Sequence, residues 1–576
     1  MTEPPLIVQA DGTVLLETQH PGYEVARDRL ARFAELEKSP EYVHFYRLSQ
    51  VSLWNAAALG EDIGKIVDWL VENARYPIVP AVLVQVREWF RRYGLLRLFA
   101  EPPDRLRLEC DEAEVLEELA NEPVLAELLT LDGGGYTLLA AQRGKLKQAL
   151  VRLGYPVDDR AGYRQGDSLS FALRTTGDCA PGESATGDRD GVFRLRDYQS
   201  AAAAAFHAAG SDRGGCGVVV LPCGAGKTVV AIAAMHLLQT NTLVLTTNTV
   251  AVRQWQRELL GKTNLHESQV GEYTGEQKQI RPVTVATYQI LTHRRSKLDA
   301  FTHMDLFDRG GFGLIVYDEV HLLPAPVFRA TAGIQARRRL GLTATLVRED
   351  GRADEVFSLI GPKRYEVPWK QLERQGFLAQ ARCTEIRVPL APARVARYAA
   401  AGARAQIRLA ADNEQKDDVV GALLSRHGAD RVLVIGQYLE QLRHLAAAFR
   451  LPLITGQTPT SERESLYAAF RRGDLPRLVV SKVGNFAIDL PLANVAIQVS
   501  GTFGSRQEEA QRLGRILRPK ADGGPASFYT LVSADSREQQ FAKKRQLFLT
   551  EQGYAYAIVS AAEVLAEAAR HREERA

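Results

Sequence analysis

The chain has 576 residues, a formal charge of +3 at pH 7, and contents of 45% hydrophobic and 24% charged residues. This composition is that of an ordinary globular protein, and the length predicts about three or four domains, each large enough for its own core. A charge so close to zero excludes attraction of nucleic acid by a whole-chain positive field, so any such affinity must come from local basic stripes.

Five cysteines are scattered along the chain without a C-x-x-C pair: Cys110, Cys179, Cys216, Cys223 and Cys383. An odd, unpaired set is typical of a reducing compartment and indicates no disulfide framework, zinc ribbon or iron–sulfur cluster. The start of the chain has no basic segment followed by an apolar core, and no apolar stretch approaches the ~20 residues of a membrane span. We therefore expect a soluble, cytoplasmic protein.

The first region of the chain, residues 1–157, begins with two short strands in 6–17 around an Asp-Gly turn. Apolar residues then recur at helical spacing, for example in 63–70 and 82–90. The pattern predicts a smaller, mainly helical region that resembles a winged-helix module. Such a module often grips DNA or another protein, but a packing appendage fits the sequence equally well.

Residues 158–191 are rich in Gly, Asp, Arg, Ser and Thr, which predicts a linker. Beyond it, short apolar strands alternate with helices, as in parallel α/β sheets. The segment 192–365 contains one set of predicted strands, at 217–220, 242–246, 282–286, 313–317 and 339–342. The segment 431–535 contains a second set, at 431–435, 453–455, 477–481, 495–499 and 527–532. We expect two parallel-sheet lobes, with a connector and insertion at 366–430 and a helical tail at 536–576.

A glycine-rich turn follows the first of these strands and reads Leu221-Pro222-Cys223-Gly224-Ala225-Gly226-Lys227-Thr228. A strand, a glycine-rich turn and a helix leave backbone N–H groups pointing at a phosphate, helped by the positive end of the helix. We expect Lys227 to bind the outer phosphates of a nucleotide and Thr228 to bind magnesium. Because Leu221 replaces the first glycine of the strict pattern, the turn alone also fits an ordinary strand-to-helix connection.

A second apolar strand, at 314–317, ends in Asp318-Glu319-Val320-His321. We expect Asp318 to hold the metal through water and Glu319 to orient and deprotonate the attacking water. His321 is not expected to bind a metal, because no second histidine stands at ligand spacing. The turn and the Asp-Glu strand are independent signals, so their combination predicts nucleotide hydrolysis.

The second predicted lobe has no phosphate loop, so it serves the same nucleotide from across a cleft or serves none. Gln511 leads a predicted helix on which Arg515 and Arg518 stand three residues apart, within joint reach of a transferring phosphate. Taken alone, two arginines at this spacing fit a solvated helix face. Because the first predicted lobe supplies half of a nucleotide site, the catalytic interpretation of Arg515 and Arg518 is favoured.

Together, these motifs resemble those of superfamily 2 helicases and, among them, the XPB family of DNA helicases. The similarity is carried by LPCGAGKT at 221–228, DEVH at 318–321, GLTATLVRED at 341–350, LIGPKRY at 359–365, SKVG at 481–484, DLP at 489–491 and the segment 507–518. Arg348-Glu349-Asp350 is the most discriminating segment, because most superfamily 2 motors lack it. The resemblance spans nearly the whole chain and implies two RecA-like lobes.

The resemblance implies further roles in the nucleotide site. Arg196 and Gln199 are expected to contact the adenine, although a helix N-terminus explains them as well. Asp489 is expected near the ribose. Thr343 and Thr345 would couple hydrolysis to DNA, and His321 would pair with Gln511.

The resemblance also implies DNA contacts by Asn248, Gln254, Thr287, Tyr288, Arg348, Glu349, Asp350, Ser481 and Lys482. Short hydroxyl and amide side chains suit such contacts, because they bind phosphate without reading sequence; plain strand-end turns are the alternative for the first four. The stretch 394–408 contains four arginines among alanines and matches the family's thumb-like DNA-gripping insertion, and a solvated basic face is an equal alternative.

The resemblance as a whole implies an ATP-dependent 3′–5′ DNA helicase or translocase that uses ATP and Mg²⁺, acts in nucleotide excision repair, and has DNA and a repair nuclease as candidate partners. The alternatives are a duplex translocase that never separates strands and a platform that recruits repair partners. An RNA helicase is disfavoured, because the chain lacks an Asp-Glu-Ala-Asp box.

Overall fold

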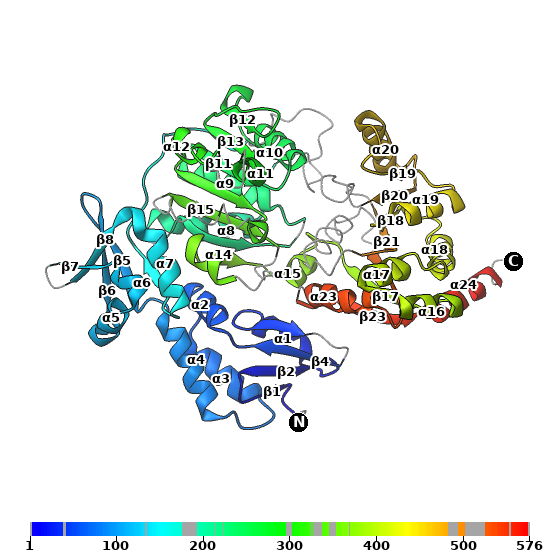
Figure 1. Cartoon of the computed structure of the whole chain (residues 1–576), viewed down its shortest axis with the longest axis horizontal. Helices are drawn as coiled ribbons and strands as arrows, with labels where there is room; N and C mark the ends of the chain where they lie inside the picture. The colour runs from blue at the N-terminus through cyan, green and yellow to red at the C-terminus, as the bar shows by residue number, and fades with distance from the viewer. Residues whose placement is uncertain are drawn as a thin grey trace. The chain divides into compact units, whose positions relative to one another are not determined.

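The computed structural model describes residues 3–38, 42–132, 135–174, 193–211, 214–222, 224–294, 302–323, 327, 334, 337–344, 353–367, 369–481, 493–501, 525–551 and 554–573. The chain divides into two compact units, of which the first contains Met1–Leu221 and Gly226–Val367 and the second contains Pro368–Ala576. Figure 1 colours the first unit from blue to green and the second from yellow-green to red. No helix within the described ranges is long and apolar enough to cross a membrane.

The N-terminal region contains an antiparallel four-stranded sheet in the order β1-β2-β4-β3. The predicted turn is present, since Gly12 has φ +81° and the Asp11 carboxylate accepts a hydrogen bond from Thr13 N–H at 2.9 Å. The strands are β1 (Leu6–Val8), β2 (Thr13–Glu17), β3 (Glu35–Lys38) and β4 (Val43–Arg47). The accompanying helices are α1 (Tyr23–Leu30), α2 (Gln50–Ala58), α3 (Ile63–Asn73) and α4 (Pro80–Arg92).

A second small sheet follows in the same region, in the order β7-β8-β6-β5-β9. Its strands are β5 (Leu96–Glu101), β6 (Arg105–Cys110), β7 (Thr130–Asp132), β8 (Gly135–Leu139) and β9 (Val157–Asp159). Its helices are α5 (Ala113–Ala120), α6 (Pro123–Ala126) and α7 (Arg143–Arg152), and the short 3₁₀ helix Ala140–Gln142 precedes α7. Helices hold more of the region's residues than strands do, so the predicted helical character is confirmed, and two small sheets accompany the helices.

The N-terminal region packs on the α/β part of the same unit. The Phe357 ring, on α14 (Ala353–Leu359), has its centroid 5.7 Å from that of Trp54 and 6.0 Å from that of Tyr93. The backbone N–H of Lys363 donates to Asn55 Oδ1 at 3.0 Å. Aromatic packing and a buried hydrogen bond thus join the two parts of this unit.

The first large sheet is parallel and seven-stranded, in the order β12-β13-β11-β14-β15-β10-β16. Its strands are β10 (Cys216–Val220), β11 (Thr242–Thr246), β12 (Val270–Tyr273), β13 (Val283–Thr287), β14 (Leu314–Asp318), β15 (Arg338–Thr343) and β16 (Lys363–Glu366). Its helices include α8 (Asp197–His207), α9 (Lys227–Leu238), α10 (Thr249–Lys262), α11 (Tyr288–Leu291) and α12 (Leu306–Arg309). The five predicted strands are confirmed, and β12 and β16 extend the sheet at its edges.

Part of the predicted linker lies against this sheet's unit. The backbone N–H of Leu169 donates to Gln239 O at 3.0 Å, and that of Arg174 donates to Lys262 O at 2.9 Å. Residues 168 and 173 also form isolated bridges with residues 240 and 263. The described stretch 158–174 is therefore fixed along the unit by backbone hydrogen bonds.

The second large sheet is also parallel and seven-stranded, in the order β19-β20-β18-β21-β22-β17-β23. Its strands are β17 (Ala381–Val388), β18 (Val432–Gly436), β19 (Leu453–Ile454), β20 (Arg477–Ser481), β21 (Val495–Gln498), β22 (Ala526–Ser533) and β23 (Ala555–Ser560). The predicted fold class, two parallel-sheet α/β lobes after a smaller N-terminal region, is confirmed.

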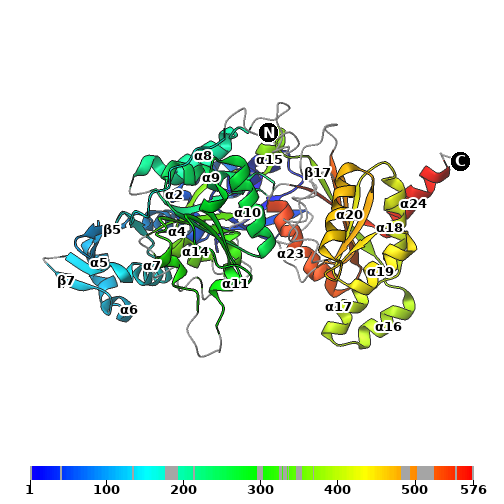
Figure 2. The same cartoon turned by 90° about the horizontal axis from the view of Figure 1, so that it is seen from above.

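The described residues of the second unit form the helices α15 (Trp369–Arg374), α16 (Pro392–Ala400), α17 (Ala403–Ala411), α18 (Gln415–Arg426), α19 (Leu439–Ala448), α20 (Thr460–Arg472), α23 (Arg537–Glu551) and α24 (Ala561–Glu573). Figure 2 shows α16 and α17 as neighbouring helices, and the two pack against each other. They form a helical hairpin within the stretch that the sequence singled out for its arginines.

Candidate active site

The glycine-rich turn connects β10 to α9, as predicted. Gly224 and Gly226 have φ +83° and +81°, in the left-handed region that favours glycine. α9 begins at Lys227 without a side-chain cap. The N–H groups in the first turn of a helix have no partner within the helix, so together with the positive end of the helix they suit a phosphate group.

Lys227 and the Asp-Glu pair of β14 lie together at the carboxyl end of the sheet. Lys227 Nζ is 3.4 Å from Glu319 Oε1, and both side chains are largely buried. Glu319 has φ +52°, which residues other than glycine rarely adopt and which is concentrated at functional sites. In this state of the protein, the ammonium group of the phosphate loop is paired with the carboxylate that we expect to act as base.

Asp318 is held by side chains that the sequence did not single out for this task. Trp255 Nε1–H donates to Asp318 Oδ2 at 2.8 Å, and Thr246 Oγ1 donates to the same oxygen at 3.5 Å. The resemblance implies DNA contacts by Asn248 and Gln254, which lie between Thr246 and Trp255 in the sequence. The N–H of a buried indole needs an acceptor, so the sequence indicates that Trp255 has one, but it does not indicate that the acceptor is Asp318.

The two carboxyl groups respond differently to burial. Burial, together with the adjacent Glu319 charge, raises the pKa of Asp318 to about 6 from an ordinary value of 3.8. Burial also disfavours ionisation of Glu319, but Lys227 and His321 outweigh this effect and hold the pKa of Glu319 below its ordinary value. Glu319 therefore ionises more readily than Asp318, which loses its proton only as the pH rises through about 6.

His321 reaches β15. Its Nδ1 is 2.7 Å from Thr343 Oγ1 and 3.6 Å from Glu319 Oε2. The predicted partner of His321, Gln511, lies outside the described residues. The contact with Thr343 connects the end of the Asp-Glu strand to the strand that leads into the segment 345–350.

Gln199 lies beside the phosphate loop. Its Nε2 is 2.6 Å from the point that a Cβ on Gly226 would occupy, and its Oε1 accepts a hydrogen bond from Arg196 N–H at 3.0 Å. Both interpretations of this motif have support, because the pair caps the start of α8 and also stands next to the loop.

The residues expected at DNA differ in exposure. Gln254 is exposed on α10, whereas Asn248 and Thr287 accept hydrogen bonds from N–H groups at the starts of α10 and α11. Ser481 is 2% exposed, and its Oγ has no hydrogen-bond partner among the described residues. The predicted DNA contact by the Tyr288 side chain needs correction: the side chain is 3% exposed, and its hydroxyl donates to the Asp318 carbonyl at 2.8 Å.

The remaining predicted site residues lie outside the described residues: Cys223, Thr345, Arg348, Glu349, Asp350, Lys482, Asp489, Gln511, Arg515 and Arg518. Their roles stay predictions.

The residues present fit a magnesium ion that arrives with a nucleotide. Within the described ranges, no group of three His, Cys, Asp or Glu side chains gathers to hold a metal by itself. Mg²⁺ is usually held by one or two carboxylates together with water and substrate phosphates. The Asp318 carboxylate and the hydroxyl of Thr228, in the first turn of α9, supply oxygen donors of this kind.

Three family models match the chain. They are "ERCC3/RAD25/XPB C-terminal helicase" over residues 372–575, "Helicase conserved C-terminal domain" over 6–132, and "Type III restriction enzyme, res subunit" over 192–348.

Curated relatives match nearly the whole chain. DNA 3′-5′ helicase XPB of Mycobacterium tuberculosis is 50% identical over 570 residues, covering 99% of this chain and 100% of the relative. Its namesake in Kineococcus radiotolerans is 51% identical over 566 residues, covering 98% of each. The general transcription and DNA repair factor IIH helicase/translocase subunit XPB/SSL2 of Saccharomyces cerevisiae is 30% identical over 629 residues, covering 97% of this chain and 72% of the relative.

Proposed function

The chain belongs to the XPB family of DNA helicases, and from this membership we infer that it is an ATP-dependent 3′–5′ DNA helicase. The observation that carries the residue assignments is the meeting of Lys227 with Glu319, next to Asp318, at the carboxyl end of the first large sheet. The lysine of a glycine-rich loop and a strand-end Asp-Glu pair are the protein groups that nucleotide hydrolysis needs on one side of the substrate.

ATP and Glu319 compete for Lys227. When the phosphates of ATP enter the loop, we propose that Lys227 turns from Glu319 to the phosphates. Glu319 then loses the cation that lowers its pKa, so it becomes a stronger base toward the attacking water. This exchange of partners keeps Glu319 a weak base until ATP is bound.

Asp318 and Thr228 would hold Mg²⁺, which supplies charge neutralisation between the outer phosphates when it is bound. Trp255 and Thr246 fix the orientation of the Asp318 carboxylate, whose side chain would otherwise rotate. Gln199, which lies beside Gly226, would contact the adenine.

The second lobe completes the site in this proposal. Arg515 and Arg518 would stabilise the charge on the transferring phosphate, and Gln511 would contact His321. Asp489 would lie near the ribose. ATP binding would close the lobes and hydrolysis would part them, moving the protein along DNA.

Contacts with DNA would come from polar groups of both lobes. Gln254 is exposed on α10, whereas Thr287 and Ser481 are 4% and 2% exposed in this structure. The other candidates are Asn248, Lys482 and the segment 348–350. Relatives named as subunits of a DNA repair factor support a role in nucleotide excision repair, with a repair nuclease as a candidate partner.

The decisive experiment measures ATP hydrolysis with and without single-stranded DNA, and strand displacement on duplexes with a 3′ or a 5′ tail. We expect hydrolysis to be stimulated by DNA and displacement to require the 3′ tail. Lys227→Ala should abolish both activities, while the exposed Lys65→Ala should abolish neither. DNA-stimulated hydrolysis without displacement would instead identify a duplex translocase, and hydrolysis that Lys227→Ala preserves would refute the site.

A different variant distinguishes the helicase from the alternative of a platform that recruits repair partners. If the protein only recruits repair partners, Glu319→Gln should leave repair in cells intact, because recruitment does not need the base. We expect Glu319→Gln to abolish repair together with hydrolysis.

A further inference from the structure

The α16–α17 hairpin is exposed along α16 and anchored at its base, and near its tip the Tyr398 hydroxyl accepts a hydrogen bond from the Arg537 N–H at 2.8 Å. α16 buries none of its residues, and Val395 on it is 50% exposed. Arg397 and Arg404 are exposed and form no ion pair with any described residue. A basic, exposed hairpin that binds a polyanion can pass a displacement to the lobe through the contacts that hold it, and those at its base lead into a buried network.

The base is fixed through the carbonyl groups at the end of α17. A helix leaves its last four carbonyls without intrahelical partners, and here these belong to residues 409–412. Arg394 Nη1 donates to Leu409 O at 3.4 Å and to Asp412 O at 2.6 Å. Ser533 Oγ donates to Ala410 O at 2.6 Å, and Gln441 Nε2 donates to Ala411 O at 2.7 Å. All four carbonyls therefore have donors, two of them from the body of the lobe.

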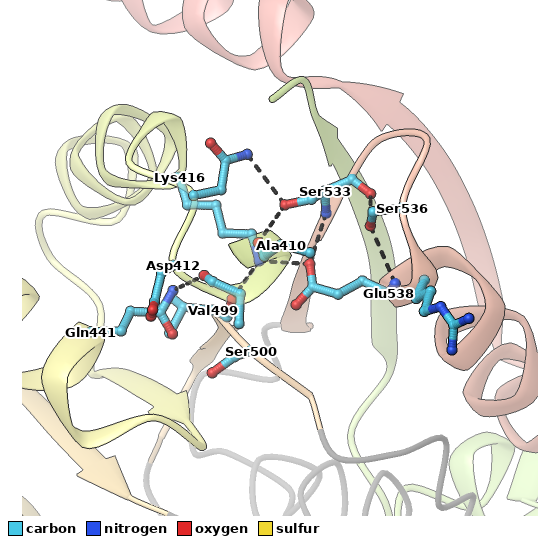
Figure 3. Close-up of polar contacts among 12 residues, drawn as sticks. Ala410, Asp412, Lys416, Gln441, Val499, Ser500, Ser533, Ser536 and Glu538 are labelled. Carbon is cyan, nitrogen blue, oxygen red and sulfur yellow. Dashed lines mark hydrogen bonds and ion pairs between the residues drawn. The ribbon is translucent and has the colours of Figure 1, made fainter. Parts of the chain in front are cut away.

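Ser533 is part of a buried ion-pair network (Figure 3). Lys416, 0% exposed, donates from Nζ to Glu538 Oε2 at 2.8 Å and to Val499 O at 3.0 Å. Glu538 Oε2 also accepts from the Ser533 N–H at 2.9 Å, and Asn413 Nδ2 donates to Ser533 Oγ at 3.2 Å. In Figure 3 the side chains of Lys416, Ser533 and Glu538 point toward one another.

The network reaches the end of β21, the strand that precedes Arg515 and Arg518 in the sequence. Val499 follows β21, and Ser500 Oγ accepts from the Gln437 N–H at 2.9 Å, after the neighbouring β18. In the sequence, the chain continues from Ser500 into the segment that carries Arg515 and Arg518. One connected set of hydrogen bonds thus joins the base of the hairpin to the start of that segment.

A contribution to stability does not by itself explain why the Lys416–Glu538 ion pair is buried. Burying two charges removes them from water at a cost that their mutual attraction only offsets, and buried apolar pairs of similar size are often as stable or more stable. A fully satisfied buried ion pair does, however, fix the relative positions of the elements that it joins. Here it joins α18, the end of β21, and the turn between β22 and α23.

We propose that Lys416 and Glu538 are positioning residues that relay displacement of the α16–α17 hairpin to the strand end preceding the arginine segment, so that hydrolysis depends on DNA held by the hairpin. The proposal rests on the proposed function, in which the hairpin binds DNA and the arginines act on the nucleotide. Coupling of this kind travels through packed and hydrogen-bonded elements, and its usual size is about 5- to 150-fold.

The experiment uses the full-length protein and measures the ratio of DNA-stimulated to DNA-free ATP hydrolysis at saturating ATP. In Lys416→Met/Glu538→Gln both charges disappear together, and the Gln amide oxygen can still accept from the Ser533 N–H. We expect the stimulation ratio to fall by roughly tenfold while the affinity for DNA, measured by fluorescence anisotropy, changes by less than about twofold. Tyr529→Phe is the control: it removes one hydrogen bond, to His427 Nε2 at 2.9 Å, from the same sheet, and should leave the ratio unchanged.

A merely structural pair would lower both rates by the same factor, so an unchanged ratio in the folded double variant overturns the proposal. Should the double variant not fold, Ser533→Ala gives the answer, because it keeps the ion pair and cuts the link to Ala410. An unchanged ratio in Ser533→Ala also overturns the relay. Absence of DNA stimulation in the wild type is a different result, which refutes the proposed function and the relay with it.

Discussion

Asp318 is a buried carboxyl group whose ionised form is costly for the fold, although the proposed function requires that form to hold magnesium. Its pKa of about 6 lies above the ordinary value of 3.8. The folded state therefore holds the proton more tightly than the unfolded state does. The resulting stabilisation is complete below pH 3.8 and is lost as the pH rises through about 6.

We predict that Asp318→Asn stabilises the nucleotide-free protein at neutral pH while abolishing ATP hydrolysis. The difference between pKa values of about 6 and 3.8 corresponds to a gain of at most about 3 kcal/mol in the free energy of unfolding. The Asn side chain retains an oxygen that can accept from the Trp255 N–H. Thermal unfolding at about pH 8 and about pH 5 measures the effect, which should shrink at the lower pH.

A variant less stable than the wild type at about pH 8 would contradict this prediction. It would mean that the ionised Asp318 is stabilised by its surroundings more than burial penalises it.

The contact between His321 and Thr343 gives a second prediction. Thr343→Val removes the hydroxyl that lies 2.7 Å from His321 Nδ1 and keeps the side-chain shape. Loss of a buried hydrogen bond costs about 1–3 kcal/mol. If Thr343 couples hydrolysis to DNA, strand displacement should fall by about tenfold and more than ATP hydrolysis falls.

Thr343→Ser keeps the hydroxyl and should restore displacement to near the wild-type rate. Equal losses of hydrolysis and displacement in Thr343→Val would show that the hydroxyl serves the hydrolytic step alone.

Single residues were predictable from sequence where their roles depend on local chain order. Lys227 follows a glycine turn, and Asp318 and Glu319 end a buried strand, so their meeting follows from the two motifs. Trp255 and Tyr288 were not predictable as partners of Asp318, because they come from helices elsewhere in the chain. The pairing of buried donors with acceptors depends on how the strands and helices pack, and it cannot be deduced from the spacing of residues along the chain.

At the level of elements, the turn between β10 and α9 gives a third prediction. Gly226 has φ +81°, and a Cβ there would lie 2.6 Å from Gln199 Nε2. Gly226→Ala therefore strains the backbone by about 1–2 kcal/mol and pushes Gln199 away from the loop. We expect ATP affinity, measured by titration calorimetry, to fall by more than about tenfold.

Gly261→Ala is the matched control. Gly261 lies near the end of α10, and a Cβ there would meet no atom within 4 Å. The change should leave ATP affinity intact and add up to about 1 kcal/mol of stability, because Ala favours a helix more than Gly does. Wild-type affinity in Gly226→Ala would show that the loop tolerates a side chain and that Gln199 is not held against it.

The strands of the two large sheets were predictable where they are buried on both faces. β11 and β20 have the predicted bounds, and β10 and β22 begin or end within one residue of them. The missed strands are edge strands or carry charges. β16 reads KRYE at one edge of its sheet, and β17 reads ARCTEIRV with alternating exposure. Edge and alternating strands lack the apolar run on which the prediction rested.

For the whole molecule, the N-terminal region and the first large sheet belong to one unit, and buried charges lie where they meet. Arg143 and Lys147 on α7 donate to Asp159 at the end of β9, with distances of 2.6 and 3.1 Å. The guanidinium carbons of Arg143 and Arg339 lie 5.2 and 6.0 Å from the centre of the Tyr163 ring. Because Arg339 belongs to β15, the cluster connects the small five-stranded sheet to the large one.

The last prediction concerns Asp159. Burial alone would raise the pKa of Asp159, but Arg143 and Lys147 outweigh burial and hold it well below the ordinary value. Its contribution to stability is present above the ordinary value of 3.8 and is lost as the pH falls below it. Asp159→Asn leaves two buried cations without a carboxylate, which should cost about 3–5 kcal/mol at neutral pH.

Urea denaturation of the full chain, followed by tryptophan fluorescence, measures this cost. The difference between the unfolding free energies of wild type and Asp159→Asn should narrow as the pH falls below 3.8, because the unfolded wild-type Asp159 then takes up a proton that the folded carboxylate binds only weakly. Asp111 pairs with Arg97 at the surface of the same sheet, with its side chain 57% exposed, so Asp111→Asn should have little effect at any pH. Equal, small effects of both variants would mean that the buried cations are solvated in solution, and that aromatic packing around Phe357 is the main contact that joins the N-terminal region to the motor.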